Sequence, residues 1–166
     1  GTGVGVPRYQ DLSLRLNFPG TKIGHLSLFA LGGQNSIDFK NSGTPVDELD
    51  DDFYTDGDED LYNSNYLGIV GLTQLISWSD KTYSKLILST QIAQNNVEID
   101  SLMGESRIPT AQYRSADIQE KVSGHFYVNH KSNAANVIRA GVMADLNYVN
   151  LQDSIFLASE NGFRTL

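Results

Sequence analysis

The chain of 166 residues contains no cysteine. Disulfide frameworks, cysteine zinc sites, iron–sulfur ligation and thiol catalysis are therefore excluded. Histidine is also scarce, with only His25, His125 and His130. His125 and His130 are five residues apart, which puts them on opposite faces of a strand, so they cannot chelate one metal ion together.

Long apolar runs are absent as well. No stretch of about 18 apolar residues exists that could form a membrane-spanning helix. This exclusion covers helices only, because barrel strands alternate lipid-facing and lumen-facing residues and hydropathy averages that signal away.

Basic residues are few relative to acidic ones. Lys and Arg together number 12 against 20 Asp and Glu, for a net charge of -8. Nucleic-acid binders carry basic stripes, so no nucleic-acid partner is predicted. The chain also has no Gly-x-Ser-x-Gly motif and no P-loop, and its acidic segment offers no rigid frame for a pair of catalytic carboxyls. We predict that the protein is not an enzyme and has no cofactor.

Apolar and polar residues alternate with period 2 along most of the sequence, and this pattern indicates β-strands. In the first strand candidate Leu12, Leu14, Leu16 and Phe18 share one parity. Similar alternation predicts six long strands in three hairpins at about residues 10–39, 65–99 and 117–150. Between and after them we expect long loops at about residues 40–63, 100–116 and 151–166. The predicted fold is all-β, an antiparallel up-and-down meander, with the whole chain as a single segment.

Short turns within hairpins and long loops between them are typical of outer-membrane barrels. One strand face is too polar for a dry core and suits a water-filled or plugged lumen; its residues are Arg15, Asn17, Lys85, Gln91, Lys121, Ser123, Asn129, Arg139, Asp145 and Asn147. Aromatic residues near strand ends would form an interface girdle: Phe18, Trp78, Tyr83 and Tyr148.

A soluble sheet with one solvated face alternates in the same way. A soluble β-barrel or β-sandwich that binds a ligand is therefore the alternative, and a structural or adhesive surface module is a third. Strand length and the asymmetry of the connections favour the membrane barrel. Single-chain barrels begin at about 8 strands, so six strands are expected to be part of a larger barrel.

Residues 5–19 resemble a strand of the TonB-dependent receptor barrels of Bacteroidetes, through Pro7, Tyr9 and Asp11 ahead of an alternating strand and a turn. Residues 24–39 are similar to the strand that follows in those receptors. The stretch 60–63 and the strand start at Thr82 and Tyr83 continue the likeness.

This resemblance implies a segment of a receptor barrel in the bacterial outer membrane, for active uptake of a nutrient such as a glycan or a metal chelate. A whole receptor would have roughly 22 strands. The implied partners are the rest of the barrel and its plug, outer-membrane lipid, and a TonB complex that acts through the missing part. The isolated fragment is expected to self-associate.

The acidic segment 47–60 also suggests calcium, because hard cations prefer clustered carboxylates. The weak candidate ligands are Asp52, Asp56, Asp58 and Asp60. The EF-hand pattern fails, since Tyr54 and Asn63 occupy two ligand positions. A solvated outer loop is the favoured interpretation, so no metal site is predicted.

Overall fold

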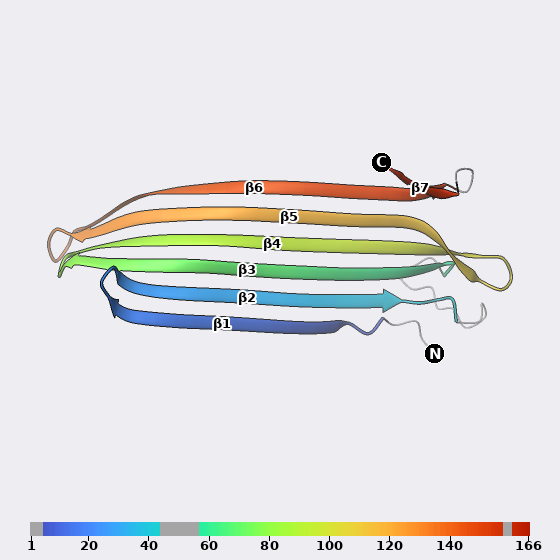
Figure 1. Ribbon diagram of the computed structural model, residues 1–166, viewed down its shortest axis with the longest axis horizontal. Coiled ribbons are helices and arrows are strands. Elements are labelled where there is room, and N and C mark those ends of the chain that lie inside the picture. Colours follow the sequence, from blue (N-terminus) through green and yellow to red (C-terminus); the bar gives the residue numbers. More distant parts are fainter. Residues whose placement is uncertain (1–4, 44–56, 158–160) are drawn as a thin grey trace.

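The computed structural model describes residues 5–43, 57–157 and 161–166. These residues form one sheet of seven antiparallel strands that follow each other in chain order (Figure 1). The strands are β1 (Arg8–Thr21), β2 (Gly24–Phe39), β3 (Glu59–Ser79), β4 (Thr82–Met103), β5 (Ile108–Lys131), β6 (Val137–Leu157) and β7 (Gly162–Thr165). The predicted all-β antiparallel meander is confirmed, and the sheet is not closed into a barrel.

Across the part of the chain that the structure describes, no helix is long and apolar enough to cross a membrane.

The loop predicted at residues 100–116 is wrong. β4 continues to Met103 and β5 begins at Ile108, so a turn of residues 104–107 connects them. Gly104 and Arg107 both have positive φ, of 71° and 50°, which closes this turn tightly. Mixed polar composition suggested a loop, but backbone hydrogen bonds extend a hairpin regardless of side-chain polarity when both faces of the ladder are open.

Two other predicted loops are shorter than expected. In the segment 151–166, β6 continues to Leu157 and β7 follows at Gly162–Thr165. In the segment 40–63, β3 already begins at Glu59, and residues 44–56 lie outside the described residues. The β1–β2, β3–β4 and β5–β6 turns lie at one end of the sheet, called the turn side below, and the β4–β5 turn lies at the opposite end, called the loop side (Figure 1).

Outside the register shifts that follow Phe18, Ser77 and Ile99, the pairing places even-numbered residues of β1 to β6 on one face of the sheet and odd-numbered residues on the other. One row of direct partners runs Leu16, Leu28, Leu72 and Leu88, and it continues to Gly124 and Ala144. Because the register is regular across six strands, the alternation in each strand adds up to two faces of different character.

The described residues contain almost no hydrophobic core. Leu102 is the only buried hydrophobic residue among them. The accessible surface is 11760 Å², whereas a compact protein of this mass would expose about 8,100 Å². A single sheet leaves both faces open, so its stability depends on what covers the apolar one.

The two central strands are more exposed at their apolar positions than at their polar ones. In β5, Val122 and Phe126 are exposed, while Lys121 and His125 on the other face are half-buried. In β4 the same holds for exposed Leu88 against half-buried Ser89. This is the reverse of a water-soluble sheet, in which the polar face is the open one.

Replacing Gly24 with alanine is expected to cost about 3 kcal/mol of folding free energy. Gly24 has φ of 95°, and a Cβ there would lie 2.4 Å from the backbone oxygen of Leu75. Gly20 in the same turn is the matched control: its φ is 73°, but nothing lies within 4 Å of a Cβ, so its replacement by alanine should cost only about 1 kcal/mol. Denaturant unfolding of the refolded variants measures both losses, and equal losses would contradict the close approach of β2 to β3.

Candidate functional site

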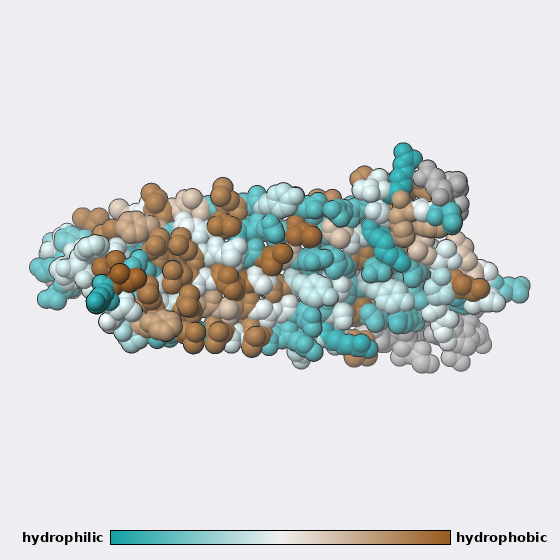
Figure 2. All heavy atoms as spheres, viewed as in Figure 1, coloured by the Kyte–Doolittle hydropathy of each residue, from teal (hydrophilic) through white to brown (hydrophobic). Residues whose placement is uncertain are grey.

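The even-numbered face carries an apolar band on its turn-side half. The only Asp, Glu, Lys or Arg in this band is Glu120, which lies in its outermost row at the loop side, between Ile92 and Tyr148. Figure 2 shows apolar side chains gathered over this half of the sheet, with hydrophilic ones toward the loop side. The apolar band consists of the even-numbered residues in the ranges 12–18, 26–32, 68–78, 84–92, 120–128 and 138–148.

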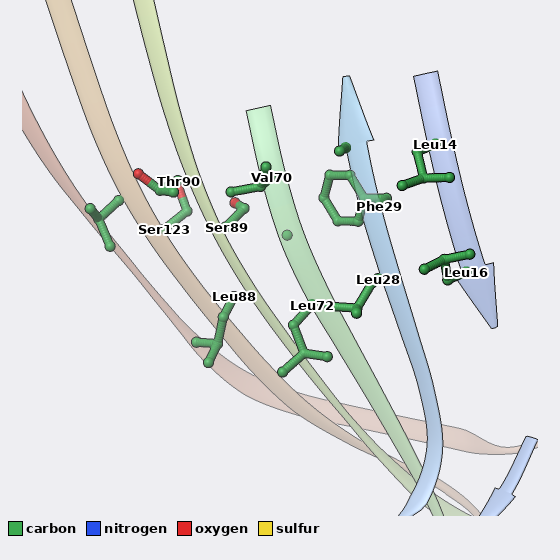
Figure 3. A pocket seen from close by; sticks show the side chains of 13 residues that line it. Leu14, Leu16, Leu28, Phe29, Val70, Leu72, Leu88, Ser89, Thr90 and Ser123 are labelled. Carbon is green, nitrogen blue, oxygen red and sulfur yellow. The ribbon is translucent and has the colours of Figure 1, made fainter. Parts of the chain in front are cut away.

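A shallow hollow of about 600 Å³ lies in the middle of the apolar band (Figure 3). Its lining includes Leu14 and Leu16 of β1, Leu28 of β2, Leu72 of β3 and Leu88 of β4. Nearly all of the lining is apolar, so this surface favours hydrocarbon over water or a polar ligand.

Aromatic side chains stand at both ends of the apolar band. Trp78, at the turn side, is 66% exposed and its indole Nε1 donates to Ser84 Oγ at 3.0 Å. Tyr148 ends the band at the loop side and is also exposed. From Ile138 to Tyr148 the strand advances about 33 Å, which at a tilt of about 40° covers about 25 Å.

The odd-numbered face carries most of the polar and charged side chains over the same part of the sheet, together with apolar residues such as Leu31, Ile69 and Ile87. Every residue predicted for the polar face lies on it, from Arg15 to Asn147. Lys121 Nζ lies 3.1 Å from an Asp145 carboxylate oxygen, and His125 Nε2 lies 3.7 Å from the other. Lys121 and Asp145 therefore have charged partners across the strands.

One predicted girdle residue lies on the wrong face. Tyr83 has odd parity and packs edge-to-face against Tyr127 on the polar face, with ring centroids 6.4 Å apart. Arg139 stacks on the same Tyr127 ring at 4.8 Å. Nearness to a strand end was the only signal used for Tyr83, and it does not specify a face.

A row of asparagines crosses the polar face at the loop side of the apolar band. Asn35, Asn65 and Asn95 are direct partners on β2, β3 and β4. Asn65 Nδ2 donates to Asn35 Oδ1 at 3.0 Å and to Asn63 Oδ1 at 2.7 Å, and Asn63 Nδ2 donates to Asn95 Oδ1 at 3.1 Å. These bonds fix the orientation of the amides and leave further donors and acceptors for a ligand.

The asparagine row borders a hollow of about 610 Å³. Tyr9 stands at the β1 end of the row and Asp117 at the β5 end, and Asp11 and Gln119 also line the hollow. Sequence reasoning missed this site, because residues about 30 apart come into line only through the strand register.

The tightest packing at the loop side joins the β2–β3 connection to the β4–β5 turn. The Arg107 side chain is 11% exposed. Its guanidinium donates to Asp58 Oδ1 at 3.2 Å, to the Asn41 carbonyl at 3.3 Å and to the Gly57 carbonyl. Asn41 and Asp60 are both buried. The two ends of the acidic connection are therefore held together and held against the neighbouring hairpin.

The described calcium candidates already have protein partners. Asp58 pairs with Arg107, and Asp60 Oδ1 accepts the backbone N–H of Asn41 at 2.6 Å and of Ser42 at 2.9 Å. Asp52 and Asp56 lie outside the described residues. Among the described residues, no group of three His, Cys, Asp or Glu side chains could hold a metal ion.

Two tyrosines at the loop side have raised pKa values. Burial and the neighbouring Asp60 and Asp100 carboxylates raise the pKa of Tyr62. The Tyr113 hydroxyl donates to Asp153 Oδ1 at 2.6 Å, and this bond raises the pKa of Tyr113 and lowers the pKa of Asp153. The Tyr113–Asp153 bond links β5 to β6 near the loop-side ends of these strands.

His125 and His130 lie on opposite faces of β5, as their spacing along the strand predicted. His125 lies on the polar face, and His130 lies on the opposite face, where its Nδ1 is 2.8 Å from Thr82 Oγ1. They do not share a site.

No protein-family model, curated protein or solved structure matches the chain. The functional argument therefore depends on the two faces of the sheet and on the contacts described above.

Proposed function

We propose that the chain forms part of the wall of a TonB-dependent receptor barrel in a bacterial outer membrane. The observation that carries the proposal is the apolar band, whose only charged residue is Glu120 at its loop-side edge, while the opposite face carries Arg15, Lys85, Lys121, Asp145 and Arg139. Outer-membrane barrels have this polarity, with an apolar band about 25 Å tall outside and a polar interior.

The open edges of the sheet support the same proposal. Within the described residues β1 pairs with β2 alone, and β6 pairs with β7 only from Ser154 to Leu157. One edge of β1 and most of one edge of β6 are therefore unpaired in this part of the chain. Unpaired backbone groups in a bilayer cost several kcal/mol each. In the proposal, the remaining strands of the receptor barrel pair with both edges, and the isolated chain self-associates through them.

The polar face would then line the lumen next to a plug. Amide, carboxylate and tyrosine groups around the asparagine row suit a hydroxyl-rich solute, because each hydroxyl can both donate and accept. This favours a glycan over a metal chelate as the imported nutrient. Energy for import would come from a TonB complex through the rest of the receptor.

The alternative is a soluble β-barrel or β-sandwich ligand-binding module. It requires a second layer that covers the apolar band in water. A chain that is monomeric and unfolds cooperatively without detergent would support this alternative and contradict the membrane barrel.

Tryptophan fluorescence tests the proposal directly, because Trp78 is the only tryptophan of the chain. After reconstitution into vesicles, Trp78 emission is expected to shift to the blue. Lipids brominated near the headgroup should quench Trp78 fluorescence more strongly than lipids brominated near the methyl end of the acyl chain, because Trp78 stands at the edge of the apolar band.

The matched control moves the tryptophan to the polar face, by combining Trp78→Phe with Tyr127→Trp. This variant should escape quenching by lipid bromines at either depth. Equal quenching of the two proteins, or a water-like emission of Trp78 in vesicles, would overturn the membrane-wall proposal.

A further inference from the structure

A small polar hollow of about 260 Å³ lies on the same face as the apolar band, at the loop side of β1, β2 and β3. Arg8, Gln10, Gln34, Ser36, Ser64 and Tyr66 of its lining are even-numbered residues. No Asp or Glu belongs to the lining. In a chain of net charge -8, this is a local site for a negatively charged group.

The register fixes the height of this hollow relative to the apolar band. Gln10, Gln34 and Tyr66 form the row next to Leu12, and Arg8 lies one row further out. At about 3.3 Å per residue and a tilt of about 40°, these rows stand about 5 Å and 10 Å beyond Leu12. The headgroup region of a bilayer occupies roughly the first 5–7 Å outside the hydrocarbon. The row of Gln10, Gln34 and Tyr66 therefore lies at headgroup level if the apolar band spans the hydrocarbon. Arg8 lies just outside that level, and its long side chain can reach back to a headgroup.

Arg8 is the cation of this hollow that is available to a ligand. No hydrogen bond or ion pair engages its guanidinium within the described residues. Two other cations at the loop side of this face already contact protein groups: Arg114 pairs with Glu98 and Asp100, and Lys40 lies 5.2 Å from the Tyr62 ring centroid.

The neighbours of Arg8 suit a phosphate. Ser36 is its direct partner on β2, and Ser64 is the next residue of the row on β3. A guanidinium fork and hydroxyl donors are the groups that bind phosphate oxygens in proteins. Gln34 Nε2 donates to Gln10 Oε1 at 3.2 Å, which orders the side of the hollow nearer the apolar band. Tyr66, 48% exposed, has the amphipathic ring that prefers the membrane interface.

We propose that this hollow binds the phosphate of an anionic lipid headgroup at the loop-side surface of the bilayer. The inference rests on the proposed membrane barrel, which places the hollow at that surface. The lipid tails would lie along the neighbouring apolar band, and Arg8 would hold the headgroup.

The test replaces Arg8 with glutamine in the full chain, reconstituted into vesicles of phosphatidylcholine with or without phosphatidylglycerol. The readout is the binding preference for phosphatidylglycerol, measured from the lipid that stays with the protein after extraction. Removing Arg8 is expected to lower this preference about fivefold. Arg15→Gln is the matched control, since it removes the same charge from the same strand on the opposite face, and it should keep the preference.

Equal preference for phosphatidylglycerol in Arg8→Gln and the unchanged chain would overturn the inference. Displacement of phosphatidylglycerol by millimolar inorganic phosphate would also overturn it, because the site would then take free phosphate. These failures differ from failure of the membrane barrel itself. If the membrane barrel fails, Trp78 is not quenched by brominated lipid at all. If only the headgroup site fails, the chain still inserts into the vesicle and lacks only the preference for phosphatidylglycerol.

Discussion

Replacing Leu88 with arginine is expected to lower the free energy of unfolding in a bilayer by about 2–4 kcal/mol. Leu88 lies in the middle of the apolar band on central strand β4, between Leu72 and Gly124, and it is 44% exposed. In the proposed barrel this side chain faces lipid, where a guanidinium is costly at the midplane. Denaturant unfolding of the vesicle-inserted protein measures the loss.

Ser89→Arg is the control for this substitution. Ser89 follows Leu88 directly but lies on the polar face, in a row with Ser123 and Asp145. An arginine there would stand in the lumen and should cost less than about 1 kcal/mol. If Ser89→Arg were as damaging as Leu88→Arg, the assignment of the two faces to lipid and lumen would fail.

Replacing Asp60 with alanine is expected to cost about 3 kcal/mol of folding free energy. Asp60 is fully buried and its Oδ1 accepts the backbone N–H groups of Asn41 and Ser42. Alanine leaves both donors without a partner in a site that water does not reach. Asp60→Asn keeps an acceptor oxygen and should cost about 1 kcal/mol.

Asp58→Ala is the matched control, since it removes the same charge two residues earlier. The Asp58 side chain is 85% exposed and pairs with Arg107 at the surface, so its removal should cost less than about 1 kcal/mol. Hydrogen exchange of the amides of Asn41 and Ser42 locates the effect. Equal losses for Asp60→Ala and Asp58→Ala would show that the total charge of the acidic connection matters and the buried carboxylate does not.

Alternation predicted the class of the fold well, because strand parity is a local property. The polar-face set from Arg15 to Asn147 shares one face in the structure as predicted. Strand ends were predicted poorly. Residues 100–116 have the composition of a loop, yet β4 and β5 pair through most of that segment, with Met103 opposite Ile108. Backbone pairing is cooperative and does not depend on side-chain polarity where neither face is packed.

The candidate sites were less accessible to sequence reasoning. The asparagine row needs Asn35, Asn65 and Asn95 in register across three strands. The polar hollow needs Arg8 beside Ser36 and Ser64. Nothing in the spacing of these residues along the chain marks them as neighbours, since the number of residues in each turn and each bulge sets which positions meet.

The sequence by itself determined that this protein is an all-β meander with one apolar and one polar set of positions, because period-2 alternation leaves no other regular structure that separates them. It also excluded thiol chemistry and a spanning helix, because the residues for them are absent. Only the tertiary structure decided how far each strand extends, which residues form a row across the sheet, and that Arg107 holds the base of the acidic connection against the β4–β5 turn. Those features depend on the register between strands, which hydrogen bonds between distant segments fix and which no local pattern encodes.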